Sequence, residues 1–301
     1  MDVISRTARH ARRVMRSIGI RKTREVYKQY MLEDHDLMRF IEDRYNNNTQ
    51  KGGGKIRKIH YVFENYDFVM YERKIEDGYD ISVRRNDDIE DAQTCLHIMC
   101  NSKLGLAYLQ NISYYKDCVK VGLQYPGGGS VLLKMFLDFM RTNKDRYKIK
   151  RIQLKDNSMY PCKNSKIKFA IMHTLMFGNT WYGKYGFRPY DPYENKPDEY
   201  GREKYNLNKL ITKTTMVKNT KLFDLLKDAL KKAKPDYTDN KIKTFVDTFR
   251  QNYGSYSVNR FAQEFLAKYD MTCDVFYLFY ERFADNIGLT NFFDRSFYLD
   301  L

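Results

Sequence analysis

Three consecutive glycines, 127–129, separate a segment of strand character from a segment of helix character. Before them, Val119, Val121 and Leu123 alternate with other residues, which predicts a half-buried strand. From Ser130 onward the apolar residues follow helical spacing. A glycine turn that opens a helix gathers unpaired backbone N–H groups at the positive end of the helix dipole. The segment therefore predicts a phosphate-binding turn, and a tight turn without a ligand is the alternative.

Two common phosphate-binding loops do not fit this segment. A P-loop requires a lysine and then serine or threonine after its last glycine, but Gly129 is followed directly by Ser130 and Val131. A dinucleotide-binding fingerprint requires a central glycine between Gly122 and Gly127, where Gln124 stands instead.

A third pattern does fit. The run Gln124-x-x-Gly127-x-Gly129 resembles the acyl-CoA loop of the GNAT superfamily of N-acetyltransferases, Gln/Arg-x-x-Gly-x-Gly/Ala. Downstream, 181–188 reads Trp-Tyr-Gly-Lys-Tyr-Gly-Phe-Arg and is similar to that family's Phe-Tyr-x-Lys-x-Gly-Phe segment. Between them, 149–156 resembles its fifth strand. The resemblance covers roughly residues 57–217 and implies acetyl transfer from acetyl-CoA to an amine.

The resemblance also implies roles for individual residues. Backbone groups of the loop would hold the pyrophosphate of acetyl-CoA, and the strand before it would pair with the pantetheine arm. The residues implied in binding are Val121, Leu123, Gln124, Gly127, Gly128, Gly129, Ser130 and Asn157. Tyr182 aligns with the tyrosine that protonates the departing thiolate, with membership of an aromatic core as the alternative. Pro126 departs from an ideal loop because it removes one N–H donor.

The sequence does not place a general base. Asp117, Glu64 and Glu72 are candidates, and a solvated surface carboxylate is the alternative for each. His97 lies within an apolar strand pattern, where we expect a hydrogen-bonded core histidine. The five cysteines include no Cys-x-x-Cys pair, so we expect reduced thiols and no metal site.

The periodicity of the chain predicts helices and strands around these residues. An antiparallel meander precedes the glycine turn, and a helix and a strand follow it, as the GNAT fold requires. We expect an α+β fold with a mixed, mostly antiparallel twisted sheet flanked by helices. The expected strands cover 59–63, 67–73, 79–83, 94–100, 105–112, 118–123, 149–156 and 207–217, and the expected helices begin at 130 and 165.

Three regions follow from this pattern. We predict that residues 1–54 form a basic helical arm and linker, that residues 55–217 form the GNAT-like acyltransferase domain, and that residues 218–301 form a helical C-terminal region. The chain carries a net charge of +15, and residues 1–30 hold nine arginines and lysines against two carboxylates. The arm over 5–28 therefore predicts contact with nucleic acid or another anionic surface, and a helix packed on the domain is the alternative.

The composition bounds where the protein acts. No run of 18 apolar residues occurs and the N-terminus lacks an apolar signal core, so we expect no transmembrane segment and an intracellular, reducing compartment. Abundant Lys, Asn, Tyr and Ile beside six Pro are typical of an AT-rich genome. This style suits a large DNA virus, with the protein in the cytoplasm or packaged in a virion.

Two functions from different classes remain open. The first is an acetyl-CoA-dependent N-acetyltransferase acting on an amine of a protein or a small molecule. The second is a catalytically inactive GNAT-like fold that serves as a structural, virion-associated or nucleic-acid-binding protein. Binding of acetyl-CoA discriminates between the two functions.

Overall fold

A computed structural model describes residues 56–85, 94–123, 127–162, 165–194, 196–268 and 275–301. The chain divides into two units, one of residues 1–55 and 191–196 and the other of 56–190 and 197–301. The predicted basic arm 5–28, its linker, and Gln124 and Pro126 of the glycine turn lie outside the described residues. In the first unit, the described part is a turn in which Asp191 accepts hydrogen bonds from the backbone of Tyr193 and Glu194.

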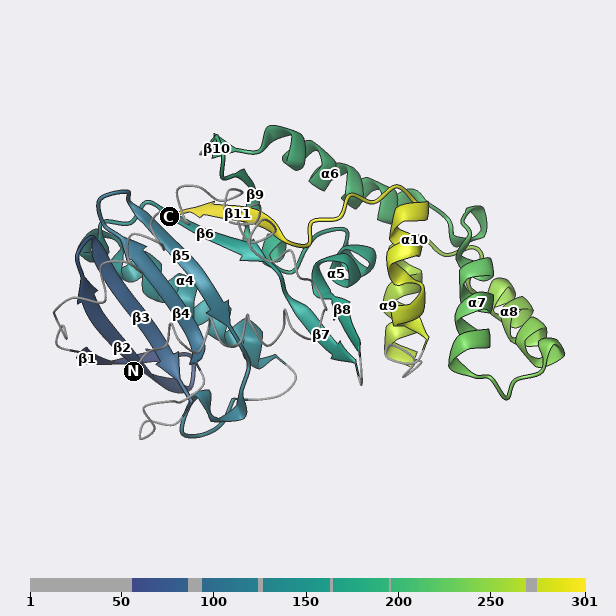
Figure 1. The fold of residues 1–301 in the computed structure, drawn as a ribbon, viewed down its shortest axis with the longest axis horizontal. Coiled ribbons are helices and arrows are strands. Elements are labelled where there is room, and N and C mark those ends of the chain that lie inside the picture. Colours follow the sequence, from purple (N-terminus) through teal and green to yellow (C-terminus); the bar gives the residue numbers. More distant parts are fainter. Residues whose placement is uncertain (1–55, 86–93, 124–126, 163–164, 195, 269–274) are drawn as a thin grey trace, which may run out of the picture. The chain divides into compact units, whose positions relative to one another are not determined.

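The second unit is built on a mixed, mostly antiparallel sheet (Figure 1). Its strands lie in the order β1-β2-β3-β4-β5-β6-β11-β9-β10. Neighbouring strands are antiparallel from β1 to β5, β5 and β6 are parallel, and β11 is antiparallel to both β6 and β9. The bounds are β1 Ile56–Phe63, β2 Tyr66–Ile75, β3 Gly78–Arg84, β4 Thr94–Asn101, β5 Leu106–Ile112, β6 Arg151–Asp156, β9 Arg188–Asp191, β10 Lys196–Pro197 and β11 Arg295–Asp300.

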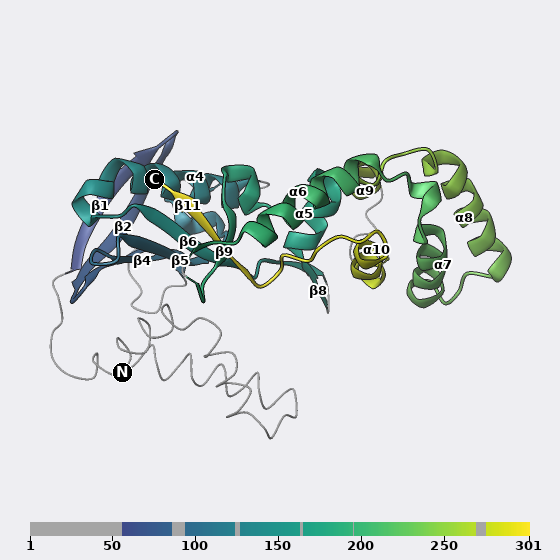
Figure 2. The same cartoon turned by 90° about the horizontal axis from the view of Figure 1, so that it is seen from above.

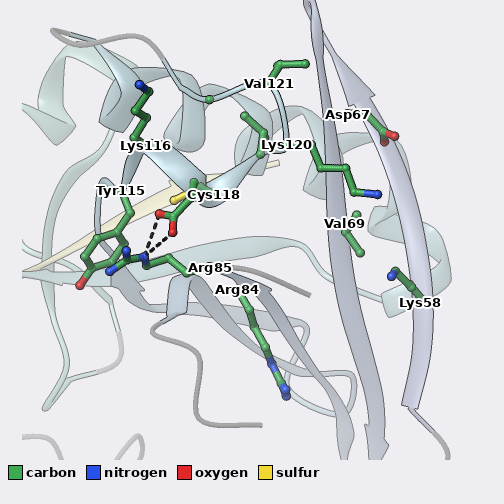
Figure 3. A pocket seen from close by; sticks show the side chains of 13 residues that line it. Lys58, Asp67, Val69, Arg84, Arg85, Tyr115, Lys116, Cys118, Lys120 and Val121 are labelled. Atoms are coloured by element: carbon green, nitrogen blue, oxygen red, sulfur yellow. Dashed lines mark hydrogen bonds and ion pairs between the residues drawn. The ribbon is translucent and has the colours of Figure 1, made fainter. Parts of the chain in front are cut away.

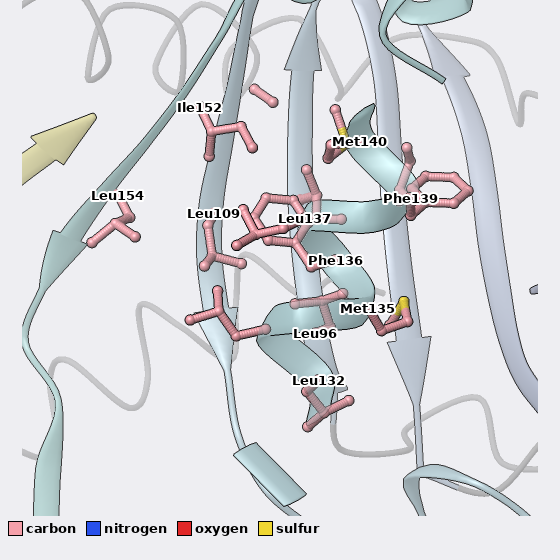
Figure 4. Close-up of a cluster of buried hydrophobic side chains, with 14 of the residues drawn as sticks. Leu96, Leu109, Leu132, Met135, Phe136, Leu137, Phe139, Met140, Ile152 and Leu154 are labelled. Carbon is pink, nitrogen blue, oxygen red and sulfur yellow. The ribbon is translucent and has the colours of Figure 1, made fainter. Parts of the chain in front are cut away.

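Helix α4, Gly128–Tyr147, connects β5 to β6 in the chain and crosses one face of this sheet (Figures 1 and 2). Its buried residues recur three and four positions apart, so a single stripe faces the strands. Figure 4 shows Leu132, Phe136 and Phe139 packed between helix and sheet. Burying each such side chain contributes about 1.5–3 kcal/mol. The helix ends at Lys148, which adopts a left-handed conformation with φ 54° and donates its N–H to Asp145.

Helices after β6 enclose a second, phenylalanine-rich core. Two short strands, β7 Met159–Cys162 and β8 Ser165–Lys168, form a separate hairpin before them. The helices are α5 Phe169–Phe177, α6 Glu199–Thr214, α7 Leu222–Ala233, α8 Asp239–Tyr253, α9 Val258–Lys268 and α10 Tyr280–Asn286. Short 3-10 turns occur at η1 Lys116–Cys118, η2 Tyr182–Tyr185, η3 Val217–Asn219 and η4 Phe276–Leu278. None of the described helices combines the length and apolarity needed to cross a lipid bilayer.

The predictions of the first five strands, of α4 and of β6 are confirmed. The strand predicted over 118–123 is wrong, because these residues form η1 and an irregular turn in which Gly122 has φ 80°. The strand predicted over 207–217 is also wrong, because 199–214 form α6, whose buried Tyr205, Asn208 and Thr212 share one helical face. The region after 218 is helical as expected, but its last residues form β11 in the main sheet.

The expectation that the cysteines are all reduced thiols is wrong for one pair. Cys95 on β4 and Cys118 at the end of η1 form a disulfide, with Cα atoms 6.0 Å apart. The backbone N–H of Ser113 donates to the carbonyl of Cys95 at 2.8 Å and so holds the segment after β5 against β4. Cys100 is a buried free thiol, whose pKa is raised mainly by burial.

Candidate active site

The parallel strands β5 and β6 separate before either one ends. They pair from Leu106 opposite Arg151 to Leu109 opposite Leu154. Beyond that point β5 continues to Ile112 and β6 to Asp156 without pairing to each other. The two strands therefore open into a wedge whose edges carry backbone N–H and C=O groups that a ligand could pair with.

A β-bulge in β5 explains why the wedge opens. Against β4, Asn111 faces His97 and Leu109 faces the next residue, Ile98, so Gln110 is the extra residue. A bulge bends its strand and increases the local twist. The bend starts one residue after the last β5–β6 pair.

The N-terminus of α4 follows β5 in the chain. Gly127 is its N-cap, and as a glycine it has no side chain that could cap the helix. The N–H groups of Ser130 and Val131 both donate to the Gly127 carbonyl, at 2.9 and 3.1 Å. These two N–H groups are used within the first turn, so the N–H groups of Gly128 and Gly129 are the ones that can face a ligand at the positive end of the dipole.

The positions of the three glycines differ in backbone conformation and in the space available to a side chain. Gly127 has φ 120°, a conformation that side-chain-bearing residues rarely adopt. A Cβ on Gly128 would lie 2.2 Å from the ring of Tyr114, so packing requires glycine there. A Cβ on Gly129 would meet no atom of the described residues within 4 Å. Position 129 therefore opens onto free space at the helix end, where a phosphate group could approach.

The segment before the glycine turn does not supply the predicted strand edge. Val121 is 77% exposed, whereas Leu123 is buried. The Leu123 N–H donates to the carbonyl of Lys116 at 2.7 Å, and its own carbonyl accepts from the Tyr114 hydroxyl at 3.1 Å. Both backbone groups of Leu123 are used within this turn. The strand edge that remains open near the glycine turn is that of β5.

Tyr182, the predicted acid, lies in η2 with its side chain buried in the sheet core. Its ring packs against Trp181 at 4.9 Å and Phe187 at 5.9 Å between centroids. Burial raises the pKa of Tyr182, and the nearby charge of Asp156 raises that pKa further. The phenol therefore stays protonated at neutral pH and has a proton to donate.

Asp156, the last residue of β6, is the acidic group that sequence reasoning missed. It is fully buried, and its Oδ1 accepts hydrogen bonds from the hydroxyl and the N–H of Ser158, at 2.5 and 3.3 Å. Among the described residues no donor reaches its Oδ2. Burial raises the pKa of Asp156 to about 6, against the lowering effect of the Ser158 hydrogen bonds. The only sequence signal is a carboxylate that ends an apolar strand.

The other sequence candidates lie elsewhere or are already paired. Asn157 follows Asp156 and is exposed. Asp117 binds Arg85 at 2.7 Å, and Glu64 lies 3.7 Å from Lys134. Both are used in ion pairs, so neither matches the unpaired, buried oxygen of a candidate base.

Two further predicted residues belong to the structure of the sheet. Glu72 is buried against α4, where it accepts hydrogen bonds from Arg146 and Tyr147. His97 is half-buried, and its Nε2 lies 2.7 Å from a carboxylate oxygen of Asp80.

Comparison of the chain with protein-family models, with curated proteins and with solved structures finds no match. The assignment of function therefore depends on the geometry of the wedge, the helix terminus and the two buried acids.

Proposed function

We propose that the chain is a GNAT-like N-acyltransferase that takes acetyl-CoA as its donor. The observation that supports this most is the wedge between β5 and β6, with the N-terminus of α4 following the bulged strand. Such an arrangement offers strand edges for an amide-containing arm and helix N–H groups for a pyrophosphate.

The strand edge in this proposal differs from the one predicted from sequence. The backbone of Gln110, Asn111 and Ile112 on β5 takes the pantetheine-pairing role expected of Val121 and Leu123. The glycine turn keeps its proposed role, with Gly129 leaving room for the pyrophosphate and Ser130 beside it. Asn157 lies beyond the end of β6, where its exposed side chain could reach the arm.

The buried acids supply the proton transfers. The acceptor amine attacks the thioester carbonyl, so a C–N bond forms and the C–S bond breaks. Asp156 would take a proton from the amine, because a carboxylate with a pKa of about 6 is ionised at neutral pH and still basic enough to act. Tyr182 would give its proton to the departing thiolate, and the proton taken up by Asp156 would pass to Tyr182, so that both groups return to their starting states.

Calorimetric titration with acetyl-CoA tests the proposal. We expect micromolar binding to the wild type and loss of binding in Gly129→Trp, because the indole would fill the free space at the helix end. Arg141→Trp is the matched control, because position 141 lies on the same helix and is exposed. This control should bind as the wild type does.

Either of two results would contradict the proposal: no binding to the folded wild type, or equal binding in both tryptophan variants. The first result would favour the alternative, a GNAT-like fold without catalysis. If acetyl-CoA binds as expected, the acceptor is sought by following thiol release from acetyl-CoA with a panel of amines, lysine peptides and polyamines.

A further inference from the structure

A charged groove lies on the sheet face that points away from α4. Asp67 and Val69 line it, and they alternate along β2 with Phe68 and Met70, which are buried. Residues 115–122, the turn between β5 and α4, form the facing wall. Because this groove and helix α4 lie on opposite faces of the sheet, the groove is separate from the proposed active site. Figure 3 shows the groove from close by, and its volume is about 660 Å³.

Cations outnumber carboxylates in this groove. Among the described residues, its charged lining consists of Lys58, Arg84, Arg85, Lys116 and Lys120 against Asp67 and Asp117. Asp117 is used by Arg85, whose Nε donates to both carboxylate oxygens at 2.7 and 2.8 Å. Arg84, Lys116 and Lys120 form no ion pair with any residue that the structure describes. The groove thus holds excess positive charge on both of its walls.

Aromatic rings accompany these cations. Tyr71 lies on the face of β2 that also carries Val69, beside the groove and not in its lining, under Lys58 at 5.8 Å and Arg84 at 5.0 Å. On the opposite wall, the Arg85 guanidinium lies 4.8 Å from the centroid of Tyr115. Figure 3 shows Tyr115 and Arg85 on one side of the groove and Lys58 and Val69 on strands at the other. Among the described lining residues, Tyr115 is therefore the ring that faces the groove, and Tyr71 lies beside the cations of the sheet wall.

We propose that this groove binds a single-stranded nucleic acid. Cations that line a groove neutralise the phosphates of a strand, and rings beside them offer surfaces on which bases can stack. The volume suits one or two nucleotides at a time rather than the width of a duplex. The net charge of +15 adds long-range attraction for any polyanion.

Fluorescence anisotropy with a labelled 12-mer oligonucleotide tests the groove in the full chain. The test variant is Arg84→Gln with Lys120→Gln. The control is Lys232→Gln with Lys243→Gln, which removes the same charge from exposed positions on α7 and α8. We expect the test variant to bind the 12-mer at least about tenfold more weakly. The negative slope of log K against log salt should become shallower by about 1.4, because two phosphate contacts are lost. The control should change neither quantity.

Three outcomes would overturn the proposal. Wild-type chain that does not bind the 12-mer would exclude the site. Equal weakening in both variants, or none in either, would place binding on general charge or on another segment such as 5–28. Displacement of the 12-mer by tripolyphosphate at matched phosphate concentration would assign the groove to free polyphosphates. Thermal unfolding is the control for folding. Both double variants should unfold at the wild-type temperature, so that a difference in anisotropy reports a difference in binding.

Discussion

Leu109 on β5 and Leu154 on β6 form the last pair of the parallel ladder, and the chain opens into a wedge directly beyond them. Both side chains are buried toward α4. The wedge thus has a packed base, and beyond it the described residues of β5 and β6 do not pair with each other. The position of the bulge at Gln110, one residue past Leu109, fixes where the opening starts.

The two neighbouring glycines at the start of α4 should respond oppositely to alanine. Gly128→Ala places a Cβ 2.2 Å from the Tyr114 ring, so we expect a loss of about 1–3 kcal/mol in the free energy of unfolding. Gly129→Ala meets open space in a helical conformation, so we expect a gain of up to about 1 kcal/mol. Urea denaturation of the pair measures both. Equal effects of the two substitutions would contradict this account of the turn.

Much of the fold is predictable from local patterns. Strands β1, β2, β3 and β5 alternate in burial over most of their length, whereas β4 is buried on both faces. Helix α4 repeats its apolar residues at helical spacing, so sequence periodicity identifies these elements. The segment 118–123 alternates in the same way and still forms no strand. A disulfide at Cys118 and a positive φ at Gly122 turn it back on itself, and neither constraint is visible in periodicity.

Long-range pairing accounts for the other failures. β11 is six residues long and lies between β6 and β9, far away in the sequence. The role of Asp156 depends on the burial that this pairing completes, since Arg295 faces Asp156 in the ladder. By contrast, Tyr182 and the glycines could be singled out because their motif is contiguous.

Asp156→Asn should remove a pH dependence of stability. The pKa of Asp156 is about 6 in the folded chain and ~3.9 when unfolded, so between these values the folded chain binds more protons. The wild type therefore loses stability as the pH rises from 4 to 6, by up to about 3 kcal/mol for two units of pKa. We expect the asparagine variant to lose less over this window, as measured by urea denaturation at each pH.

The control for this experiment is Asp236→Asn, whose side chain is exposed. It should keep the wild-type pH profile. Parallel profiles for Asp156→Asn and the wild type would show that the buried carboxylate does not titrate in this range.

If the chain transfers acetyl groups as proposed, Tyr182→Phe should lower the rate of that transfer while leaving the fold intact. Loss of a general acid costs about 100-fold or more in kcat, and binding of acetyl-CoA should not change. Tyr185→Phe is the matched control in η2, because the Tyr185 hydroxyl is buried with no hydrogen-bond partner among the described residues. Equal rates for the two variants and the wild type would make Tyr182 a core residue only.

Glu72 should be a major source of stability for the packing of α4 on the sheet. Its carboxylate accepts bonds from Arg146 at 2.5 and 2.7 Å and from the Tyr147 hydroxyl at 2.5 Å. Glu72→Ala leaves the buried Tyr147 hydroxyl unpaired, while the exposed Arg146 guanidinium can return to water, so we expect a loss of about 2–4 kcal/mol. Tyr147→Phe removes one bond and should cost about 1–3 kcal/mol. Denaturation midpoints that do not differ between these variants would contradict the assignment.

Reduction of the Cys95–Cys118 disulfide should destabilise the turn that carries both the groove wall and the approach to α4. The bond closes a loop with a sequence separation of 23, for which the loss of chain entropy in the unfolded state predicts about 3 kcal/mol. We expect Cys95→Ser with Cys118→Ser to lose this amount in urea denaturation, and dithiothreitol to lower the stability of the wild type but not of the double variant.

Cys100→Ser is the control, because this buried thiol is free and its loss should make no difference to the effect of dithiothreitol. Unchanged wild-type stability under dithiothreitol, with both thiols shown to be alkylated after unfolding, would mean that the bond contributes nothing to the fold.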